Sequence, residues 1–88
     1  MAENIVEIKN KLGLHARPAA EFVKMAAKFK SNVYISKNDR VVNGKSIMGV
    51  MTLAAEMGSE LRIQAIGEDE NEALKALVEL INNKFNED

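Results

Sequence analysis

The sequence predicts an α+β fold in which four strands form an antiparallel sheet and three helices cover one face of that sheet. Two observations lead to this prediction. Apolar residues alternate with polar residues in four short segments, and they recur every three to four residues in the other segments. Each segment therefore has a single apolar face, and one layer of helices on one layer of strands buries all of these faces. The order of the elements is β-α-β-β-α-β-α.

The first two elements are a strand and a helix. Ile5, Val6 and Ile8 lie among Glu and Lys residues, which predicts a short strand that the turn residues at 10–13 end. From Ala16 the apolar period changes to that of an amphipathic helix, with Pro18 in the first turn, where a missing N–H costs nothing. The predicted core-facing stripe of this helix consists of Ala19, Phe22, Val23, Ala26 and Phe29.

The middle of the chain predicts a hairpin and a short helix. Residues 33–35 and 41–42 read as two strands joined by the polar turn at 37–40. Ser46 then opens a compact apolar segment, 47–53, whose Met content favours a helix over a strand.

The last two elements are a strand and the clearest helix. Residues 60–67 alternate as a half-buried strand does. Asp69 and Glu72 form a variant capping box, which predicts that a helix of about four turns begins there. Its apolar stripe is Leu74, Leu77, Val78, Ile81 and Phe85.

Length, charge and cysteine content restrict the class of protein. A chain of 88 residues, 47% of them hydrophobic, has material for one core, so we expect one domain over 1–88. The formal net charge of −1 gives no electrostatic case for binding nucleic acid or a membrane surface. No cysteine and one histidine exclude disulfides and thiolate or histidine-cluster metal sites, and we expect no cofactor. The first residues resemble no signal or transit peptide, no stretch approaches the ~20 apolar residues of a membrane span, and a cytoplasmic location is expected.

The one imidazole is the candidate reactive group. His15 directly precedes the predicted first helix, whose first N–H groups have no partner within the helix and favour an anion. Arg17 would add a charge-assisted hydrogen bond to phosphate oxygens, and the helix dipole keeps the ring neutral and nucleophilic. No second base, metal site or nucleotide-binding glycine-rich loop accompanies it, which favours a phosphoryl carrier. The alternative is a loop histidine without a role.

Two motifs resemble those of the HPr family, the histidine-containing phosphocarriers of the phosphoenolpyruvate:sugar phosphotransferase system. They are LGLHARPAA at 12–20 and KSIMGVM at 45–51, and the resemblance covers the whole chain. It implies an HPr-like open-faced β-sandwich. It also implies a carrier, and not an enzyme acting alone, in which Nδ1 of His15 accepts phosphate from enzyme I and passes it to sugar-specific enzyme IIA domains. Arg17 and the amides of Ala16 and Arg17 would hold the phosphate, and a monomer is expected.

The second motif has a regulatory meaning in that family. The resemblance implies that an ATP-dependent HPr kinase/phosphorylase phosphorylates Ser46 and that the product binds a catabolite-control transcription factor of the CcpA type. The structural alternative is that Ser46 caps a helix, and both roles are compatible. Gly44 departs from the larger residue often found before Lys-Ser in Gram-positive members of the family.

A docking surface is predicted beside the histidine. It would consist of Leu14, Ile47, Met48 and Met51, because methionine adapts to several partners. Cations would surround it and steer acidic partners: Arg17, Lys24, Lys28 and Lys45. Ordinary core packing is the alternative for Met51 and partly for Ile47, and a solvated helix face is the alternative for Lys24 and Lys28.

Three other functions compete with the sugar-system carrier. A nitrogen-type or regulatory HPr paralogue would share the chemistry of His15 but use another enzyme I. A small α/β regulatory binding module would carry no phosphate at all. An RNA-binding module is disfavoured by the charge of −1 and by the presence of only one Tyr and three Phe for base stacking.

Overall fold

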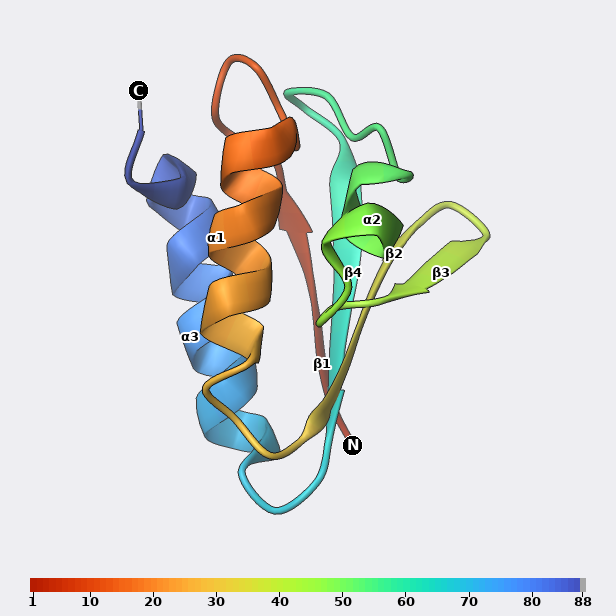
Figure 1. The fold of residues 1–88 in the computed structure, drawn as a ribbon, viewed down its shortest axis with the longest axis vertical. Coiled ribbons are helices and arrows are strands. Elements are labelled where there is room, and N and C mark those ends of the chain that lie inside the picture. The colour runs from red at the N-terminus through yellow and green to blue at the C-terminus, as the bar shows by residue number, and fades with distance from the viewer. Residues whose placement is uncertain (88) are drawn as a thin grey trace.

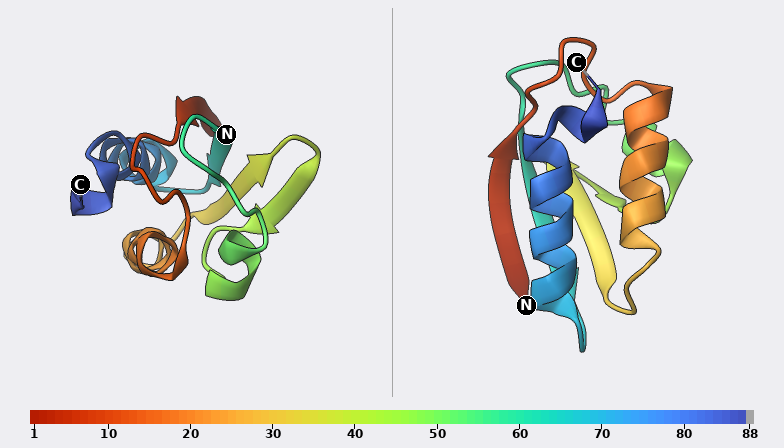
Figure 2. Two further views of the ribbon diagram at one scale, coloured as in Figure 1. Left: turned by 90° about the horizontal axis from the view of Figure 1, so that it is seen from above. Right: turned by 90° about the vertical axis from the view of Figure 1, so that its left-hand side faces the viewer.

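Four strands form one antiparallel sheet, and three helices lie on a single side of it (Figures 1 and 2). The structure is a computed structural model and describes residues 1–87. The strands are β1 (Ala2–Glu7), β2 (Asn32–Lys37), β3 (Arg40–Asn43) and β4 (Glu60–Ile66). The helices are α1 (Ala16–Ala26), α2 (Ile47–Met51) and α3 (Glu70–Asn82), and a short helical turn, η1 (Lys84–Asn86), follows. The predicted fold class and order of elements are confirmed.

The strand order in the sheet is β1-β4-β2-β3, so the last strand in the sequence lies inside the sheet. Its outer neighbour is β1, with Ala2 opposite Ala65, and its other neighbour is β2, with Asn32 opposite Ile66. The β2–β3 hairpin turns tightly at Asn38, which has a φ of 54°. Asparagine is one of the few residues that adopt this left-handed conformation readily, which explains the sharp turn.

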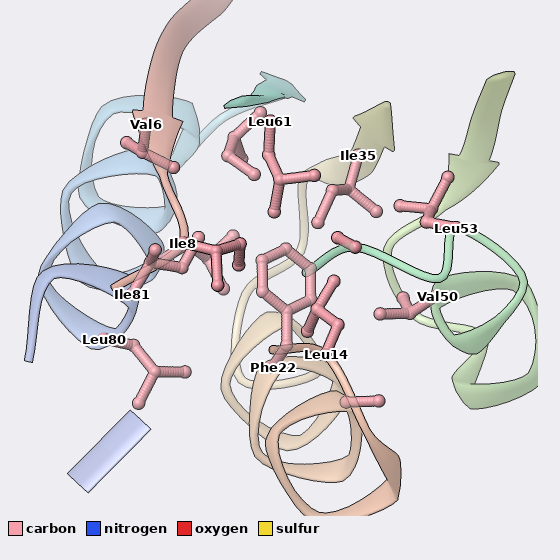
Figure 3. Packing of buried hydrophobic residues seen from close by; sticks show 14 of the residues in the cluster. Val6, Ile8, Leu14, Phe22, Ile35, Val50, Leu53, Leu61, Leu80 and Ile81 are labelled. Atoms are coloured by element: carbon pink, nitrogen blue, oxygen red, sulfur yellow. The ribbon is translucent and has the colours of Figure 1, made fainter. Parts of the chain in front are cut away.

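The core lies between the sheet and the helices. Phe22 of α1 points into the middle of a cluster to which the strands, α2 and α3 all contribute (Figure 3). The opposite face of the sheet has no such cover, and it leaves Ile5, Val41 and Ile66 exposed. The fully buried residues of the cluster include Ile8, Ile35, Val50, Leu61, Ile63, Leu77 and Ile81. This single cluster explains why every element has one apolar face.

Helix ends are where the structure departs from the predicted stripes. Helix α1 ends at Ala26, and Phe29 lies beyond it, half-buried. Helix α3 ends at Asn82, yet Phe85 is buried because the chain turns back on itself: all three residues of η1 have positive φ, of 58°, 55° and 62°. Helix α2 stops at Met51, two residues earlier than predicted. The apolar period therefore continues past the helices, since turns also deliver side chains to the core.

The start of α3 is correctly predicted, but the capping box is wrong. Asp69 precedes the helix and makes no side-chain bond to its first turn. Its carboxylate instead accepts hydrogen bonds from the N–H groups of Lys30 and Ser31 and from the Ser31 hydroxyl, while Glu72 is exposed. The side chain of Asp69 therefore binds the neighbouring loop instead of its own helix.

No helix within residues 1–87 combines the length and the apolar composition that crossing a membrane requires.

Candidate functional site

The loop before α1 determines where the histidine lies. Gly13 has a φ of 67°, and a Cβ at this position would collide with the carbonyl oxygen of Ala55. Because glycine has no Cβ, the chain packs closely there, and the N–H of Leu14 donates to that same carbonyl oxygen at 2.8 Å. This contact fixes the loop one residue before His15.

His15 occupies the N-cap position of α1 with an extended backbone. Its carbonyl oxygen accepts from the N–H of Ala19 at 3.0 Å, while its side chain makes no capping bond and is 37% exposed. The ring is therefore available to solvent. The amides of Ala16 and Arg17 belong to the first turn, where N–H groups have no carbonyl within the helix to bind and where the helix dipole is positive. The structure thus brings together the three predicted site residues at one helix end.

The structure adds a carboxylate to this site. Oε1 of Glu87 lies 3.2 Å from Nε2 of His15 and also accepts a hydrogen bond of 2.8 Å from Nδ2 of Asn10. Burial tends to raise the pKa of Glu87, but the hydrogen bonds from Asn10 and His15, together with the charges of His15 and Arg17, lower that pKa below its usual range. Glu87 is therefore ionised at neutral pH. Sequence reasoning missed it, because nothing local indicates a contact between residues this far apart in the chain.

An open hollow of about 420 Å³ surrounds the ring. Its lining residues are Lys11, Leu12, His15, Arg17 and Glu87. Lys11 and Arg17 are both exposed cations beside a half-exposed imidazole, which suits a small anion. Lys11 and Leu12 were not predicted as site residues; their place in the turn immediately before the histidine was the available signal. Within residues 1–87 no group of three metal-ligating side chains is positioned to hold a metal ion.

Ser46 caps α2, as the structural alternative predicted. Its Oγ accepts a hydrogen bond of 3.1 Å from the N–H of Gly49, and the residue is half-buried. The helix that it caps carries three exposed apolar side chains, Ile47, Met48 and Met51, which we call the docking patch. Met48 is the most open of them at 74% exposed. A charge added at Ser46 would therefore lie beside this exposed apolar surface.

Two of the residues predicted to belong to the docking surface behave differently. Leu14 is only 4% exposed and packs in the core, because the Gly13 turn directs it inward. Lys45 is half-buried, and its Nζ donates to the carbonyl oxygen of Phe29 at 2.8 Å. This hydrogen bond connects the segment before α2 to the loop between α1 and β2. Lys24 and Lys28 are exposed, at the end of α1 and just after it.

Known proteins are similar to this chain in sequence and in fold. The family model described as PTS HPr component phosphorylation site matches residues 2–83. The chain is 52% identical over 87 residues to the phosphocarrier protein HPr of Neisseria meningitidis, covering 99% of this chain and 98% of that protein.

Two solved structures from Thermoanaerobacter tengcongensis are also similar. A crystal structure of HPr-C-His has a TM-score of 0.96 and 53% identity and covers 100% of this chain and 99% of that chain. A crystal structure of an HPr dimer has a TM-score of 0.79 and 54% identity and covers 99% and 100% respectively. Sequence, fold and length agree, and this chain belongs to the HPr family of phosphocarrier proteins of the phosphotransferase system.

Proposed function

We propose that this chain carries a phosphoryl group on Nδ1 of His15 from enzyme I to sugar-specific enzyme IIA domains during phosphoenolpyruvate-driven sugar uptake. The observation that carries the proposal is the orientation of the ring. Nε2 faces the Glu87 carboxylate, and among residues 1–87 no hydrogen bond engages Nδ1. Family membership supports the phosphocarrier role, and the hollow with Lys11 and Arg17 supports the place of the phosphate.

The chemistry is a displacement at phosphorus. The lone pair of Nδ1 forms the N–P bond while the bond from phosphorus to the donor breaks, and the donor keeps the electron pair of that bond. The Arg17 guanidinium and the first-turn amides of Ala16 and Arg17 stabilise the phosphoryl oxygens. On the acceptor, the same steps run in reverse with His15 as leaving group. The chain needs no cofactor, and it acts as a transfer intermediate and not as an enzyme alone.

Ser46 is proposed as a regulatory phosphosite for an ATP-dependent HPr kinase/phosphorylase. A phosphate on Oγ would remain at the start of α2, where the Gly49 N–H already donates. Its charge of about −1.5 to −2 would lie next to the docking patch and weaken binding to partners that fit the neutral surface. The same charge would create a new surface for a CcpA-type transcription factor, which links the carrier to catabolite repression.

We further propose that the carrier acts as a cytoplasmic monomer. A monomer leaves both the hollow and the docking patch open to partners. Two relatives, HPr of Thermoanaerobacter tengcongensis and Crh of Bacillus subtilis, have been crystallised as dimers, so light scattering of this chain across a concentration series is the direct test. A mass corresponding to two chains at micromolar concentration would contradict the monomer.

The carrier function is tested by intact-protein mass after incubation with phosphoenolpyruvate and a bacterial enzyme I. We expect one acid-labile phosphate on the wild type and none on His15→Ala, whereas phosphate on Ser46 would survive acid. A wild type that stays unlabelled, with an enzyme I that labels a control HPr, would contradict the proposal. Labelling only by a nitrogen-type enzyme I would favour the regulatory paralogue, and thermal stabilisation by a small effector without labelling would favour a binding module.

A further inference from the structure

The turn after α3 holds Glu87 against the histidine. In η1 the chain adopts three consecutive left-handed residues, and the buried Phe85 anchors this turn in the core. The turn contacts both α1 and α3 and lies beside the start of α1 (Figures 1 and 2). Left-handed backbone at non-glycine residues is uncommon and persists only where the surroundings maintain it. The position of Glu87 is therefore set by core packing.

Asn10 holds the same carboxylate from the other side. Its side chain is fully buried, and its Nδ2 donates both to the carbonyl oxygen of Gly13 and to Oε1 of Glu87, each at 2.8 Å. Oε1 thus receives a donor from the loop before α1 and faces Nε2 of His15 as well. The side chain of Glu87 is 20% exposed, less than that of His15 at 37%. These contacts keep the carboxylate in place while the ring stays accessible.

The identity of the acceptor determines the protonation of the ring. An ionised carboxylate only accepts hydrogen bonds, so the nitrogen that faces it must carry the proton. In the neutral imidazole of His15, Nε2 is therefore the N–H nitrogen and Nδ1 keeps its lone pair. We propose that Glu87 is a positioning residue for His15, which holds the ring proton on Nε2 and offsets the positive charge that the ring gains when Nδ1 takes up a phosphoryl group. This inference rests on the proposed carrier function.

The charge balance of the step explains the second part of this role. When the Nδ1 lone pair forms the N–P bond, the ring becomes an imidazolium, Nε2 keeps its proton, and the electron pair of the broken bond leaves with the donor. Lys11 and Arg17, the other charged side chains among the described lining residues, are both cations and disfavour an imidazolium. Among residues 1–87, Glu87 is the one carboxylate that lines the hollow, at 3.2 Å from Nε2. A carboxylate orients and stabilises an imidazolium in the same way in serine-protease triads.

The test separates hydrogen bonding from charge with two variants and a matched control. Glu87→Gln keeps an acceptor oxygen but loses the charge, and Glu87→Ala loses both. Glu79→Gln, at an exposed position on α3, makes the same change of charge away from the site. Two quantities are measured: the ratio of the Nε2–H to the Nδ1–H tautomer by imidazole ¹⁵N spectroscopy of unphosphorylated protein, and the initial rate of phosphorylation by phosphoenolpyruvate and enzyme I.

For Glu87→Ala we expect the tautomer ratio and the initial rate each to fall about five-fold, as for loss of one partly exposed hydrogen bond. For Glu87→Gln we expect a nearly unchanged ratio and a rate about three-fold lower than that of Glu79→Gln. Both Glu87 variants matching Glu79→Gln in ratio and rate would overturn the proposal, and a rate unchanged in Glu87→Gln would overturn the charge role. An unlabelled wild type would instead count against the carrier function, because the tautomer ratio is measured without phosphorylation.

Discussion

Asp69 joins two loops at the end of the molecule opposite the histidine by accepting hydrogen bonds from both the N–H and the hydroxyl of Ser31. The Ser31 hydroxyl, the Lys30 N–H and the Ser31 N–H together outweigh partial burial and lower the pKa of Asp69 to about 2. In the unfolded chain this carboxyl titrates near its ordinary value of about 3.9. Asp69 therefore favours the folded state only where it is ionised.

The first prediction concerns acid stability. A group whose pKa is lowered on folding contributes stability that is fully present above its unfolded pKa and is lost as the pH falls through its folded pKa. We expect Asp69→Asn to be less stable than the wild type at pH 7, with the difference shrinking between about pH 4 and pH 2. Urea denaturation at a series of pH values measures this. A difference that stays constant down to pH 2 would contradict the assigned role.

The second prediction concerns the loop that places His15. Gly13→Ala forces a left-handed alanine and a collision with the Ala55 carbonyl oxygen, so we expect a loss of about 1–3 kcal/mol in the free energy of unfolding. Gly58→Ala is the control, since Gly58 also has positive φ but a Cβ there would meet no atom within 4 Å. Chemical denaturation of both variants gives the comparison. Equal losses would show that the close contact at Gly13 contributes nothing beyond backbone strain.

The third prediction concerns the cap of α2. Ser46→Ala removes the acceptor of the Gly49 N–H and should lower the free energy of unfolding by about 1 kcal/mol. Ser46→Asp keeps an acceptor at the cap and should stay close to the wild type. Thermal and urea denaturation measure both variants. If Ser46→Asp were destabilised as much as Ser46→Ala, phosphorylation would be expected to disturb the helix itself.

The fourth prediction concerns the docking patch. Met48→Asp should leave stability within about 0.5 kcal/mol, because the side chain is largely exposed. It should raise the KM of enzyme I for this carrier about ten-fold, as expected when a charge replaces an apolar contact at the centre of an interface. Val41→Asp is the control, an exposed apolar residue on the uncovered face of the sheet. Equal KM values for the two variants would place the interface elsewhere.

Much of the fold follows from the sequence, because the elements are defined by local periodicity. Phe22 and Leu77 lie in the core where their stripes predict. Phe29 and Phe85 continue those stripes but lie beyond the helices, since a side chain can also reach the core from a turn. Met48, which is predicted from the sequence to belong to a docking surface, is exposed as such a surface requires.

The site was only partly predictable for a physical reason. His15 and Arg17 lie next to the helix start in the sequence, so their proximity to its unpaired N–H groups can be predicted locally. Glu87 acts through a contact between distant segments, and its position depends on a left-handed turn that ordinary residues rarely adopt. The assignment of Leu14 to the docking surface was wrong, because the conformation of the preceding Gly13 directs the Leu14 side chain into the core.

The placement of β4 between β1 and β2 affects how the chain folds. Until β4 is inserted, β1 has no hydrogen-bonded neighbour and β2 has only the short β3 beside it. Pairing of Ala2 with Ala65 closes a long loop, and such non-local contacts slow folding. Folding and unfolding are therefore expected to proceed in one cooperative step.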